Sequence, residues 1–449
     1  MMKKEKITLI GAGLAGSLLA ILLAQKGFEV VVYEKRADMR KAGYVGGRSI
    51  NLALSARGIK ALEKANIAHE VLTEAIPMQG RMIHDIEGNQ IFTPYGKNEQ
   101  EYINSISRAG LNIALIQAAE KYPNIRFFFE APLEKVDFEQ QILHFANTSP
   151  QPFEICIATD GAGSAMRQAM LQQNFTSEKV ELLAHGYKEL TIFPNQQQDF
   201  CLEKNALHIW PRKNFMLIAL PNIDKTFTCT LFLANEGEKD SFANLNTAEE
   251  VLSFFKQYFP DALALMPQLA EEFLQNPVGM LATLRCPNWH VQGKTLLLGD
   301  AAHAIVPFYG QGMNASFEDC LALDALINTE GNNDWQKIFE TYQTQRIHNT
   351  TAIANLAIEN FYEMRDAAAN PTFQRMRRLE IMLENAYPDY LSKYAMVTFH
   401  PEIPYSVAQQ KGNLQNELLM HFCENHTELE KINIAEVHQM LHDKTTASL

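Results

Sequence analysis

The first strongly apolar stretch of the chain covers Ile7–Ala24 and is interrupted by three glycines. Its pattern predicts a strand over Lys6–Ile10, a glycine turn, and a helix over Ser17–Gln25. A second apolar alternation predicts a strand over Glu29–Tyr33. The lysines before the stretch imitate a signal peptide, but charged residues follow it and no small-residue cleavage site does. We therefore expect a βαβ unit that belongs to the fold.

Later patterns alternate between buried strands and amphipathic helices, as in an α/β fold. A cluster of closely spaced strands in the region 180–285 predicts a separate sheet, and from about residue 335 the pattern is helical and punctuated by prolines. The predicted elements are a helix over Arg108–Lys121, strands over Arg126–Phe129, Ile155–Ala158, Leu207–Trp210, Phe215–Leu220, Phe227–Leu233 and Thr295–Leu298, and a helix over Asn314–Leu326.

Charge and composition exclude several classes of partner. The 449 residues include 39 Lys and Arg against 52 Asp and Glu, a net charge of −13, so we expect no nucleic-acid partner. The six cysteines form no CxxC pair or metal-ligand cluster, which predicts free thiols, no metal site and a reducing cytoplasm. The tail over His438–Leu449 has no apolar stretch, so we expect no membrane anchor. Nothing in the pattern indicates an oligomeric state.

The first motif is the G-x-G-x-x-G turn formed by Gly11, Gly13 and Gly16. The first glycine permits the tight turn, the second lets a pyrophosphate approach the backbone, and the third lets helix and strand pack closely. Glu34 ends the second strand, where an acid can accept hydrogen bonds from ribose hydroxyls. An acid there favours an unphosphorylated adenosine ribose, and so NAD or FAD over NADP.

Two later segments distinguish FAD from NAD. One is Thr159-Asp160-Gly161-Ala162-Gly163-Ser164, which continues to Arg167, and the other is Gly299-Asp300-Ala301-Ala302-His303, followed by Pro307 to Asn314. With the opening turn, and in the same order, they resemble the single-component FAD-dependent aromatic hydroxylases, the group of para-hydroxybenzoate hydroxylase. Ala158 and Thr159 depart slightly from that group's pattern, in which Gly and Ala are commoner. No second G-x-G-x-x-G is present, which disfavours a reductase with two dinucleotide domains.

The resemblance implies a role for each matching residue. Asp300 would accept a bond from a ribityl hydroxyl, and the N–H groups at the start of the helix near Met313 would stabilise charge on the reduced flavin. Arg108 would lie near the pyrophosphate, or else be a surface arginine at a helix start. The expected cofactor-binding residues are Gly11, Gly13, Leu14, Ala15, Gly16, Glu34, Lys35, Arg36, Arg48, Ala53, Arg108, Leu133, Asp160, Asp300, Gly312, Met313 and Asn314.

The same resemblance implies the chemistry. NAD(P)H, with NADPH favoured by the resemblance alone, would reduce noncovalently held FAD, and oxygen would pass from a flavin C4a-hydroperoxide to an electron-rich aromatic carbon. Because the cofactor carries that chemistry, the protein has to position the ring and exclude water. We therefore assign no catalytic residue and expect His303 to be structural.

Further segments resemble the kynurenine-hydroxylating branch of this family over about residues 5–400, among them Gly47–Ser55, Ile76–His84, Leu207–Arg212 and Glu359–Arg365. That branch acts on L-kynurenine, a zwitterionic amino acid on an anilino ketone. By resemblance, Arg81 and Tyr95 bind its carboxylate, and Asn360 and Tyr394 add contacts, with Tyr405 as the alternative to Tyr394. Candidates for the ring slot, or for plain core packing, are Phe232, Pro307 and Phe308.

The resemblance predicts an FAD-binding Rossmann-like domain of the para-hydroxybenzoate hydroxylase type, with a β-sheet substrate domain and a C-terminal helical region. The expected boundaries are 1–75, 100–180 and 286–345 for the first, 76–99 and 181–285 for the second, and 346–449 for the third. Two alternatives stay open. One is a hydroxylase of another aromatic acid, such as a salicylate or anthranilate. The other is a non-hydroxylating flavoprotein such as a geranylgeranyl-type reductase or a halogenase, although the halogenase W-x-W-x-I motif is missing.

Overall fold

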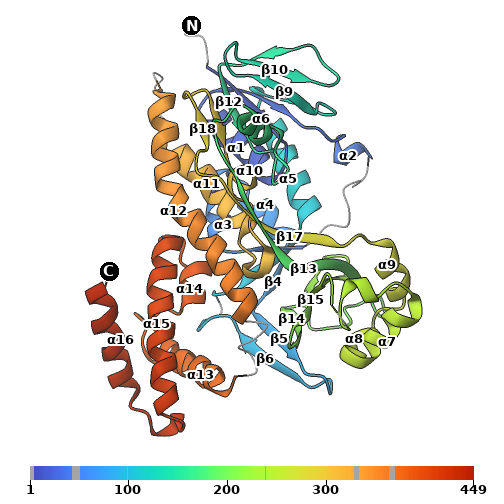
Figure 1. The fold of residues 1–449 in the computed structure, drawn as a ribbon, viewed down its shortest axis with the longest axis vertical. Coiled ribbons are helices and arrows are strands. Elements are labelled where there is room, and N and C mark those ends of the chain that lie inside the picture. Colours follow the sequence, from blue (N-terminus) through green and yellow to red (C-terminus); the bar gives the residue numbers. More distant parts are fainter. Residues whose placement is uncertain are drawn as a thin grey trace. The chain divides into compact units, whose positions relative to one another are not determined.

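The computed structural model describes residues 5–42, 51–98, 100–237, 239–327, 333–363 and 370–448 (Figure 1). The chain divides into two compact units, each built from three separate segments. Unit 1 consists of residues 1–75, 106–182 and 282–354, and unit 2 consists of residues 76–105, 183–281 and 355–449.

Unit 1 is built on a six-stranded sheet with the order β18-β19-β12-β1-β2-β8. The neighbours from β19 to β8 are parallel, and β18 is antiparallel to β19. Parallel strands need crossover connections, and helix α1 supplies the one between β1 and β2. The strands are β1 (Lys6–Ile10), β2 (Glu29–Tyr33), β8 (Ile125–Phe128), β12 (Ile155–Ala158), β18 (His290–Val291) and β19 (Thr295–Leu297).

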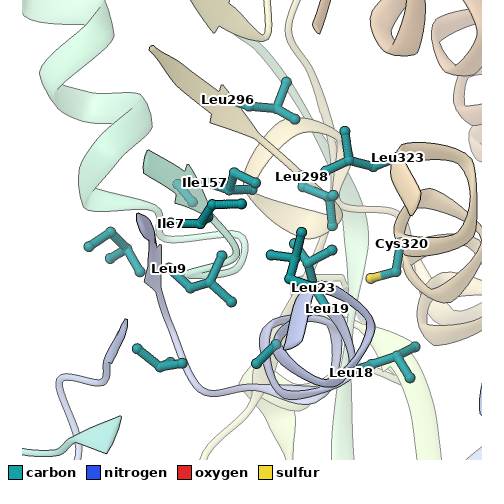
Figure 2. Packing of buried hydrophobic residues seen from close by; sticks show 14 of the residues in the cluster. Ile7, Leu9, Leu18, Leu19, Leu23, Ile157, Leu296, Leu298, Cys320 and Leu323 are labelled. Atoms are coloured by element: carbon teal, nitrogen blue, oxygen red, sulfur yellow. The ribbon is translucent and has the colours of Figure 1, made fainter. Parts of the chain in front are cut away.

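Apolar side chains from the sheet and its helices form the core of unit 1. Ten of the twelve residues of α1 are apolar or glycine, the exceptions being Ser17 and Gln25, so most of this helix is buried. Figure 2 shows part of the cluster, in which α1 packs against the sheet and against α11. The labelled side chains are Ile7, Leu9, Leu18, Leu19, Leu23, Ile157, Leu296, Leu298, Cys320 and Leu323.

The other elements of unit 1 include a small antiparallel sheet with the order β11-β10-β9. Its strands are β9 (Leu133–Asp137), β10 (Ile142–Phe145) and β11 (Gln151–Pro152), and a further strand is β3 (Asn51–Leu54). The helices that begin in this unit are α1 (Leu14–Gln25), α2 (Met39–Ala42), α3 (Ala56–Lys64), α4 (Ala68–Thr73), α5 (Arg108–Glu120), α6 (Ala165–Gln172), α10 (Asp300–His303), the 3-10 helix Pro307–Tyr309, α11 (Gly312–Leu326) and α12 (Trp335–Tyr362), of which α12 ends in unit 2.

Unit 2 contains most of a seven-stranded sheet with the order β17-β13-β16-β15-β14-β5-β6. The pairs β13–β16, β16–β15, β15–β14 and β5–β6 are antiparallel, and the pair β14–β5 is parallel. The strands are β5 (Gly80–His84), β6 (Gln90–Pro94), β13 (Lys179–Ile192), β14 (Ala206–Arg212), β15 (Phe215–Pro221), β16 (Phe227–Ala234) and β17 (Gly279–Arg285). Strand β4 (Ile76–Met78) pairs with β7 (Ile103–Ser107).

Three short helices, α7 (Ala248–Tyr258), α8 (Pro260–Leu263) and α9 (Leu269–Gln275), bury apolar side chains with this sheet in one cluster. A 3-10 helix, Phe242–Asn244, precedes them. The C-terminal helices are coloured orange to red in Figure 1. They are α13 (Pro371–Ala386), α14 (Lys393–Thr398), α15 (Tyr405–Asn425) and α16 (Ile434–Ser448), with a 3-10 turn at Leu429–Lys431. Helices α13, α15 and α16 share a second apolar cluster, and α14 lies against α15.

The predicted βαβ opening and α/β class are confirmed, but two details of the predicted pattern are wrong. The first helix begins at Leu14 and not at Ser17, because its first turn contains the third glycine of the motif. The region 180–285 contains α7–α9 in addition to strands. A signal for α7 was present: Thr247 and Glu250 form a capping box at its start. All six cysteines are free, and among the described helices none has the length and apolar character of a membrane span.

Candidate functional site

The glycine turn after β1 has the backbone geometry that its motif predicts. Gly11 has φ +101°, and a Cβ there would lie 2.7 Å from the carbonyl oxygen of Thr159. A Cβ on Gly16 would lie 2.0 Å from the carbonyl oxygen of Gly11, so only glycine fits. A Cβ on Gly13, in contrast, would meet no protein atom within 4 Å. The turn therefore packs tightly on its inner side and is open at Gly13, where the motif places a pyrophosphate.

Polar side chains from other segments hold this turn in place. The Thr159 hydroxyl lies 3.0 Å from the carbonyl oxygen of Ile10 and 2.9 Å from that of Gly11, and it shares its proton between them. The amide of Asn112 donates to the carbonyl of Ala12 at 2.9 Å. Thr159 stands where the resemblance expected a smaller residue, and the structure gives that departure a function. We call the two contacts of the Thr159 hydroxyl the Thr159 clamp. It was not predicted from the sequence, although a hydroxyl next to the second fingerprint could have indicated it.

Glu34 lies directly after β2, at the edge of the sheet where the turn begins. Its two carboxylate oxygens accept hydrogen bonds from the N–H groups of Ala12 at 2.8 Å and Arg36 at 2.9 Å. Lys35 and Arg36 are exposed beside it, and Leu133 is half-buried at the start of β9. The carboxylate is thus oriented by the backbone, and each oxygen keeps a lone pair for a ribose hydroxyl.

The second fingerprint forms the turn between β12 and α6. Oδ2 of Asp160 accepts hydrogen bonds from the N–H groups of Ala165 at 2.8 Å and Met166 at 3.3 Å. Its Oδ1 is buried and has no partner among the described residues, and burial raises the pKa of this carboxyl. Arg167 donates to the carbonyl of Ala301 at 2.9 Å and so ties this fingerprint to the third one.

The third fingerprint begins directly after β19. Gly299 has φ +64°, and Asp300 is half-buried at the first position of α10. Burial raises the pKa of the Asp300 carboxyl, although the positive charge of Arg108 at the start of α5 opposes that shift. A half-buried acid near an arginine, at the carboxyl end of a parallel strand, is suited to accept a hydrogen bond from a ligand.

Helix α11 begins with a backbone that its own side chains hold rigidly. Gly310 has φ +68°, and a Cβ there would lie 3.1 Å from the Cβ of Ala53. The buried amide of Asn314 accepts from the N–H of Ser55 at 3.0 Å and donates to the carbonyls of Ala53 at 2.9 Å and Gly310 at 3.0 Å. The Asn314 side chain is therefore structural. The N–H groups of the first helical turn, at Gly312, Met313 and Asn314, have no intrahelical acceptor and can stabilise an anion.

A buried ion cluster lies behind this turn and was not predicted. Nε2 of His303 lies 2.7 Å from Oδ2 of Asp319, and Nε of Arg346 lies 2.6 Å from Oδ1. Arg346 also pairs with Glu318 at 3.0 Å, and Glu318 pairs with the buried Arg57. Burial raises the pKa of Asp319, but His303 and Arg346 lower it by more than burial raises it, so the net shift of this pKa is downward. This contact is consistent with a structural role for His303. The adjacent acids Glu318 and Asp319, in a largely apolar helix, were the available signal.

Unit 2 brings together three of the predicted substrate residues. The guanidinium carbon of Arg81, on β5, lies 5.1 Å from the centroid of the Tyr95 ring and 4.5 Å from that of Tyr394. The two tyrosine rings stack with their centroids 5.6 Å apart and an angle of 11°. Tyr394 lies on α14, whereas Tyr405 is fully buried at the start of α15. Of the two tyrosines that the sequence left open, Tyr394 has its ring against the Arg81 guanidinium.

The Tyr95 hydroxyl is well placed to donate to a ligand. It is buried and has no hydrogen-bond partner among the described residues. Burial strongly raises the pKa of Tyr95, and Arg81 only partly opposes this, so the hydroxyl keeps its proton. A cation on two aromatic faces with a neutral hydroxyl beside it forms a partly dry site for a carboxylate.

The remaining predicted substrate residues are spread over both units. Asn360 is half-buried near the end of α12, and Phe232 is buried in β16, both in unit 2. Pro307 is exposed and Phe308 is half-buried in the 3-10 helix of unit 1, so neither belongs to the buried core. Arg48 lies outside the described residues, as do Gly47 and Arg365 of the resembling segments.

Comparisons with known proteins agree with these fingerprints. A family model described as FAD binding domain matches residues 4–357. The chain is 43% identical to kynurenine 3-monooxygenase of Myxococcus xanthus, covering 99% of this chain and 96% of that relative. The corresponding enzyme of Legionella pneumophila is 42% identical and covers 99% and 100%. The chain belongs to the kynurenine 3-monooxygenase family.

Solved structures with the same fold are more distant from this member of the kynurenine 3-monooxygenase family. The tetrameric form of 2-methyl-3-hydroxypyridine-5-carboxylic acid oxygenase matches with a TM-score of 0.66 and 17% identity, over 88% of this chain and 95% of that one. Pseudomonas aeruginosa PqsL in complex with 2-aminobenzoylacetate also has a TM-score of 0.66 and 17% identity, over 81% and 97%. These likenesses confirm the fold expected from the fingerprints.

Proposed function

We propose that this chain is an FAD-dependent monooxygenase that hydroxylates L-kynurenine to 3-hydroxykynurenine with O₂ and NAD(P)H, NADPH being the favoured donor. The observation that carries the proposal is that one chain contains three FAD fingerprints, in unit 1, and the Arg81–Tyr95–Tyr394 cluster, in unit 2. Near-full-length relatives named kynurenine 3-monooxygenase support the substrate. FAD, when bound, supplies the activation of oxygen.

The residues of unit 1 fit FAD. The open backbone at Gly13 and the free N–H groups of the first turn of α1 fit the pyrophosphate, and Glu34 fits the adenosine ribose. Asp300 fits a ribityl hydroxyl, and the N–H groups at Gly312 and Met313 fit the electron-rich edge of the flavin ring. We propose that Leu14, Ala15, Lys35, Arg36, Ala53, Arg108, Leu133, Asp160 and Asn314 border the same cofactor.

Arg81 binds the substrate carboxylate in this proposal. A guanidinium offers two parallel N–H groups, and the stacked tyrosine rings fix its plane. The Tyr95 hydroxyl donates one more hydrogen bond, and Asn360 and Tyr394 complete the polar end of the site. Phe232, Pro307 and Phe308 are proposed for the ring, which has to be kept away from water while it is hydroxylated.

The domain functions follow from these assignments. Segments 1–75, 100–180 and 286–345 hold FAD, segments 76–99 and 181–285 supply the substrate sheet, and 346–449 adds the helical region with Tyr394. The six free thiols favour a reducing compartment, so we place the enzyme in the cytoplasm.

The test is NAD(P)H oxidation by the purified flavoprotein with and without L-kynurenine, combined with the mass of the product. We expect slow oxidation without substrate and fast oxidation with it, and a product heavier by one oxygen. The hydroxyl should be ortho to the aniline nitrogen, because that donor enriches this ring position. Coupled product from salicylate or anthranilate, with none from kynurenine, would reject the proposal in favour of another aromatic acid.

A further inference from the structure

Two buried histidines of unit 2 form a chain of hydrogen bonds outside all three fingerprints. His84 ends β5 and His208 lies in the neighbouring strand β14, and both side chains are fully buried. Nε2 of His84 lies 2.8 Å from Nδ1 of His208. The parallel register places His208 opposite Met82, so both rings lie on the face of the sheet that Gly80 and Met82 share.

Both ends of this chain terminate at acceptors. Nδ1 of His84 lies 2.9 Å from Oδ2 of Asp261, in α8. Nε2 of His208 lies 2.9 Å from the backbone carbonyl oxygen of Glu203. The indole N–H of Trp210 donates to the same Asp261 oxygen at 2.8 Å. A carbonyl oxygen can only accept, and so can an ionised carboxylate.

Counting protons shows that two neutral rings cannot make these bonds. The row from Asp261 through His84 and His208 to Glu203 contains three hydrogen bonds, and each of them needs one ring N–H. Two neutral imidazoles have only two N–H groups. Burial raises the pKa of Asp261, yet the hydrogen bonds from His84 and Trp210 outweigh it and leave that pKa below its usual value. Asp261 is therefore ionised, and the third proton belongs to a ring.

The surroundings indicate which ring carries it. Burial lowers the pKa of His208 to about 4, and the charge of His84 lowers it as well, so His208 is neutral. The Trp210 ring stacks on His84 with centroids 4.0 Å apart and an angle of 25°, and an indole face favours a cation. His84 also has the direct contact with the carboxylate of Asp261.

Other charged groups surround the hydrogen-bonded pair of His84 and His208. From β14, Arg212 donates to the carbonyls of His84 and Asp85, each at 3.0 Å, and its like charge opposes a cation on His84. Asp85 and Glu87, in the turn after β5, and Asp261 act on Arg212 with negative charge, and Glu203 acts on His208. From α7, the carbonyl of Tyr258 accepts from Nε of Arg212 at 2.6 Å. The acids in this environment outnumber Arg212.

We propose that His84 is a doubly protonated imidazolium held between Asp261 and His208, and that it is a positioning residue for Arg81. The two residues lie about 10 Å apart on β5 and point to opposite faces of the sheet. His84 thus fixes the strand from the helix-covered face while Arg81 meets the substrate on the other. The second half of this inference rests on the carboxylate-binding role proposed for Arg81.

The charge state is tested on the whole flavoprotein by NMR of ¹⁵N-labelled histidine rings. The coupling across an N–H···N bond between two imidazoles identifies the pair. At neutral pH we expect one ring of the pair with both nitrogens protonated and the other with one. Two singly protonated rings would overturn the inference. This spectrum needs no substrate, so it does not depend on the proposed function.

Asp261→Asn is the matched variant, because an amide oxygen in the place of Oδ2 can accept from both Nδ1 of His84 and Trp210 but carries no charge. Without this counter-charge the third proton is no longer held, so we expect both rings to be singly protonated. Wild-type melting temperature should fall from pH 6 to pH 9 relative to this variant, as the wild-type pair loses its third proton. Parallel pH profiles would contradict the charged pair, and if the variant does not fold, the wild-type spectrum decides alone.

The positioning role is tested by the dissociation constant of L-kynurenine for the two proteins over the same pH range. The ratio of the wild-type constant to that of Asp261→Asn removes the titration of kynurenine itself. We expect this ratio to rise several-fold toward pH 9. A constant ratio would overturn the positioning role. If neither protein binds kynurenine while the NMR result holds, the proposed function has failed and the charged pair has not.

Discussion

The guanidinium carbon of Arg81 lies 4.5 Å from the centroid of the Tyr394 ring, although the two residues are more than 300 positions apart in the chain. Tyr95 stacks parallel to the same tyrosine and faces the same guanidinium. A guanidinium on aromatic faces keeps its plane and directs its N–H groups along that plane. This arrangement is suited to a planar carboxylate, and it gives the substrate proposal a specific test.

Replacing Arg81 should weaken substrate binding and leave FAD in place. Loss of one partner of a buried, hydrogen-bonded charge pair costs about 2–5 kcal/mol, so Arg81→Ala should raise the kynurenine dissociation constant by tens-fold to thousands-fold. Arg81→Lys should recover only part of this, because an ammonium cannot form two parallel bonds. Flavin absorbance during kynurenine titration measures both variants.

Decarboxylated kynurenine is the matched ligand control for this prediction. It should bind the wild-type protein weakly, and the loss of Arg81 should hardly change its affinity. A variant that lost FAD, or that bound kynurenine as the wild type does, would show that Arg81 does something else.

The two tyrosines that the sequence left open should behave differently. Tyr394→Ala removes one aromatic face from Arg81 and should cost about 0.5–2 kcal/mol of kynurenine binding. Tyr394→Phe keeps the face and should cost less. Tyr405→Phe, in a fully buried ring at the start of α15, should leave the dissociation constant unchanged. The same titration compares them, and an effect at Tyr405 with none at Tyr394 would reverse the assignment.

The pattern of apolar residues and glycines predicted those strands and turns that are determined by interactions between residues close together in the sequence. Lys6–Ile10 and Ile155–Ala158 are strands with the predicted bounds, because short apolar runs before a glycine turn have few alternatives. The G-x-G-x-x-G turn is similarly specific, since side chains would clash at Gly11 and Gly16. Motif spacing and resemblance predicted the residues that we propose to bind FAD for the same reason.

Contacts between distant segments could not be predicted in this way. The Asp319–Arg346 pair and the His84–His208 chain depend on which strands and helices become neighbours, and periodicity does not encode that. The cluster at Arg81 was found only through resemblance. Helices α7–α9 were missed because closely spaced strands on both sides dominated the pattern of that region, even though Thr247 and Glu250 marked the start of α7.

The Thr159 clamp should matter for FAD binding. Thr159→Val keeps the shape of the side chain but removes the hydroxyl shared by the carbonyls of Ile10 and Gly11. An unsatisfied buried group costs about 1–3 kcal/mol, so we expect a less stable apoprotein and weaker FAD binding. Thr159→Ser should restore most of both. Equal FAD affinity for the wild type and Thr159→Val would show that the clamp does not shape the turn.

The buried Asp319 should make stability depend on acid pH. Burial raises its pKa, but His303 and Arg346 bring it below the ordinary value of about 3.9. A carboxyl with a lowered folded-state pKa stabilises the fold above the unfolded-state pKa, and this contribution is lost as pH falls through the folded-state pKa. Asp319→Asn should therefore cost about 3–5 kcal/mol near pH 7 and progressively less below about pH 4.

Denaturant unfolding between pH 3 and pH 8 measures this difference. The exposed Glu139 is the matched control, because Glu139→Gln removes a charge without a buried partner and should change stability little at any pH. A difference between the wild type and Asp319→Asn that did not vary with pH would mean that the cluster acts through packing and not through charge.

Asp300 differs from Asp319, because it should lower the stability of the apoprotein while it strengthens FAD binding. Burial raises the pKa of its carboxyl, so the ionised group costs stability in the apoprotein at neutral pH, with Arg108 offsetting only part of that cost. Asp300→Ala should leave the apoprotein as stable as the wild type or slightly more so. It should also remove a hydrogen bond that the charged carboxylate accepts from FAD, worth about 1.5–3 kcal/mol, and raise the FAD dissociation constant by about ten-fold to a hundred-fold.

Melting temperatures with and without FAD separate these two effects. FAD stabilises the folded chain by an amount that grows with the ratio of FAD concentration to the dissociation constant. Removing FAD should therefore lower the melting temperature of the wild type by more than it lowers that of Asp300→Ala. Asp300→Asn keeps one oxygen acceptor without the charge and should fall between the two. An Asp300→Ala apoprotein that melts well below the wild-type apoprotein, with unchanged FAD affinity, would show that Asp300 supports the fold and not the cofactor.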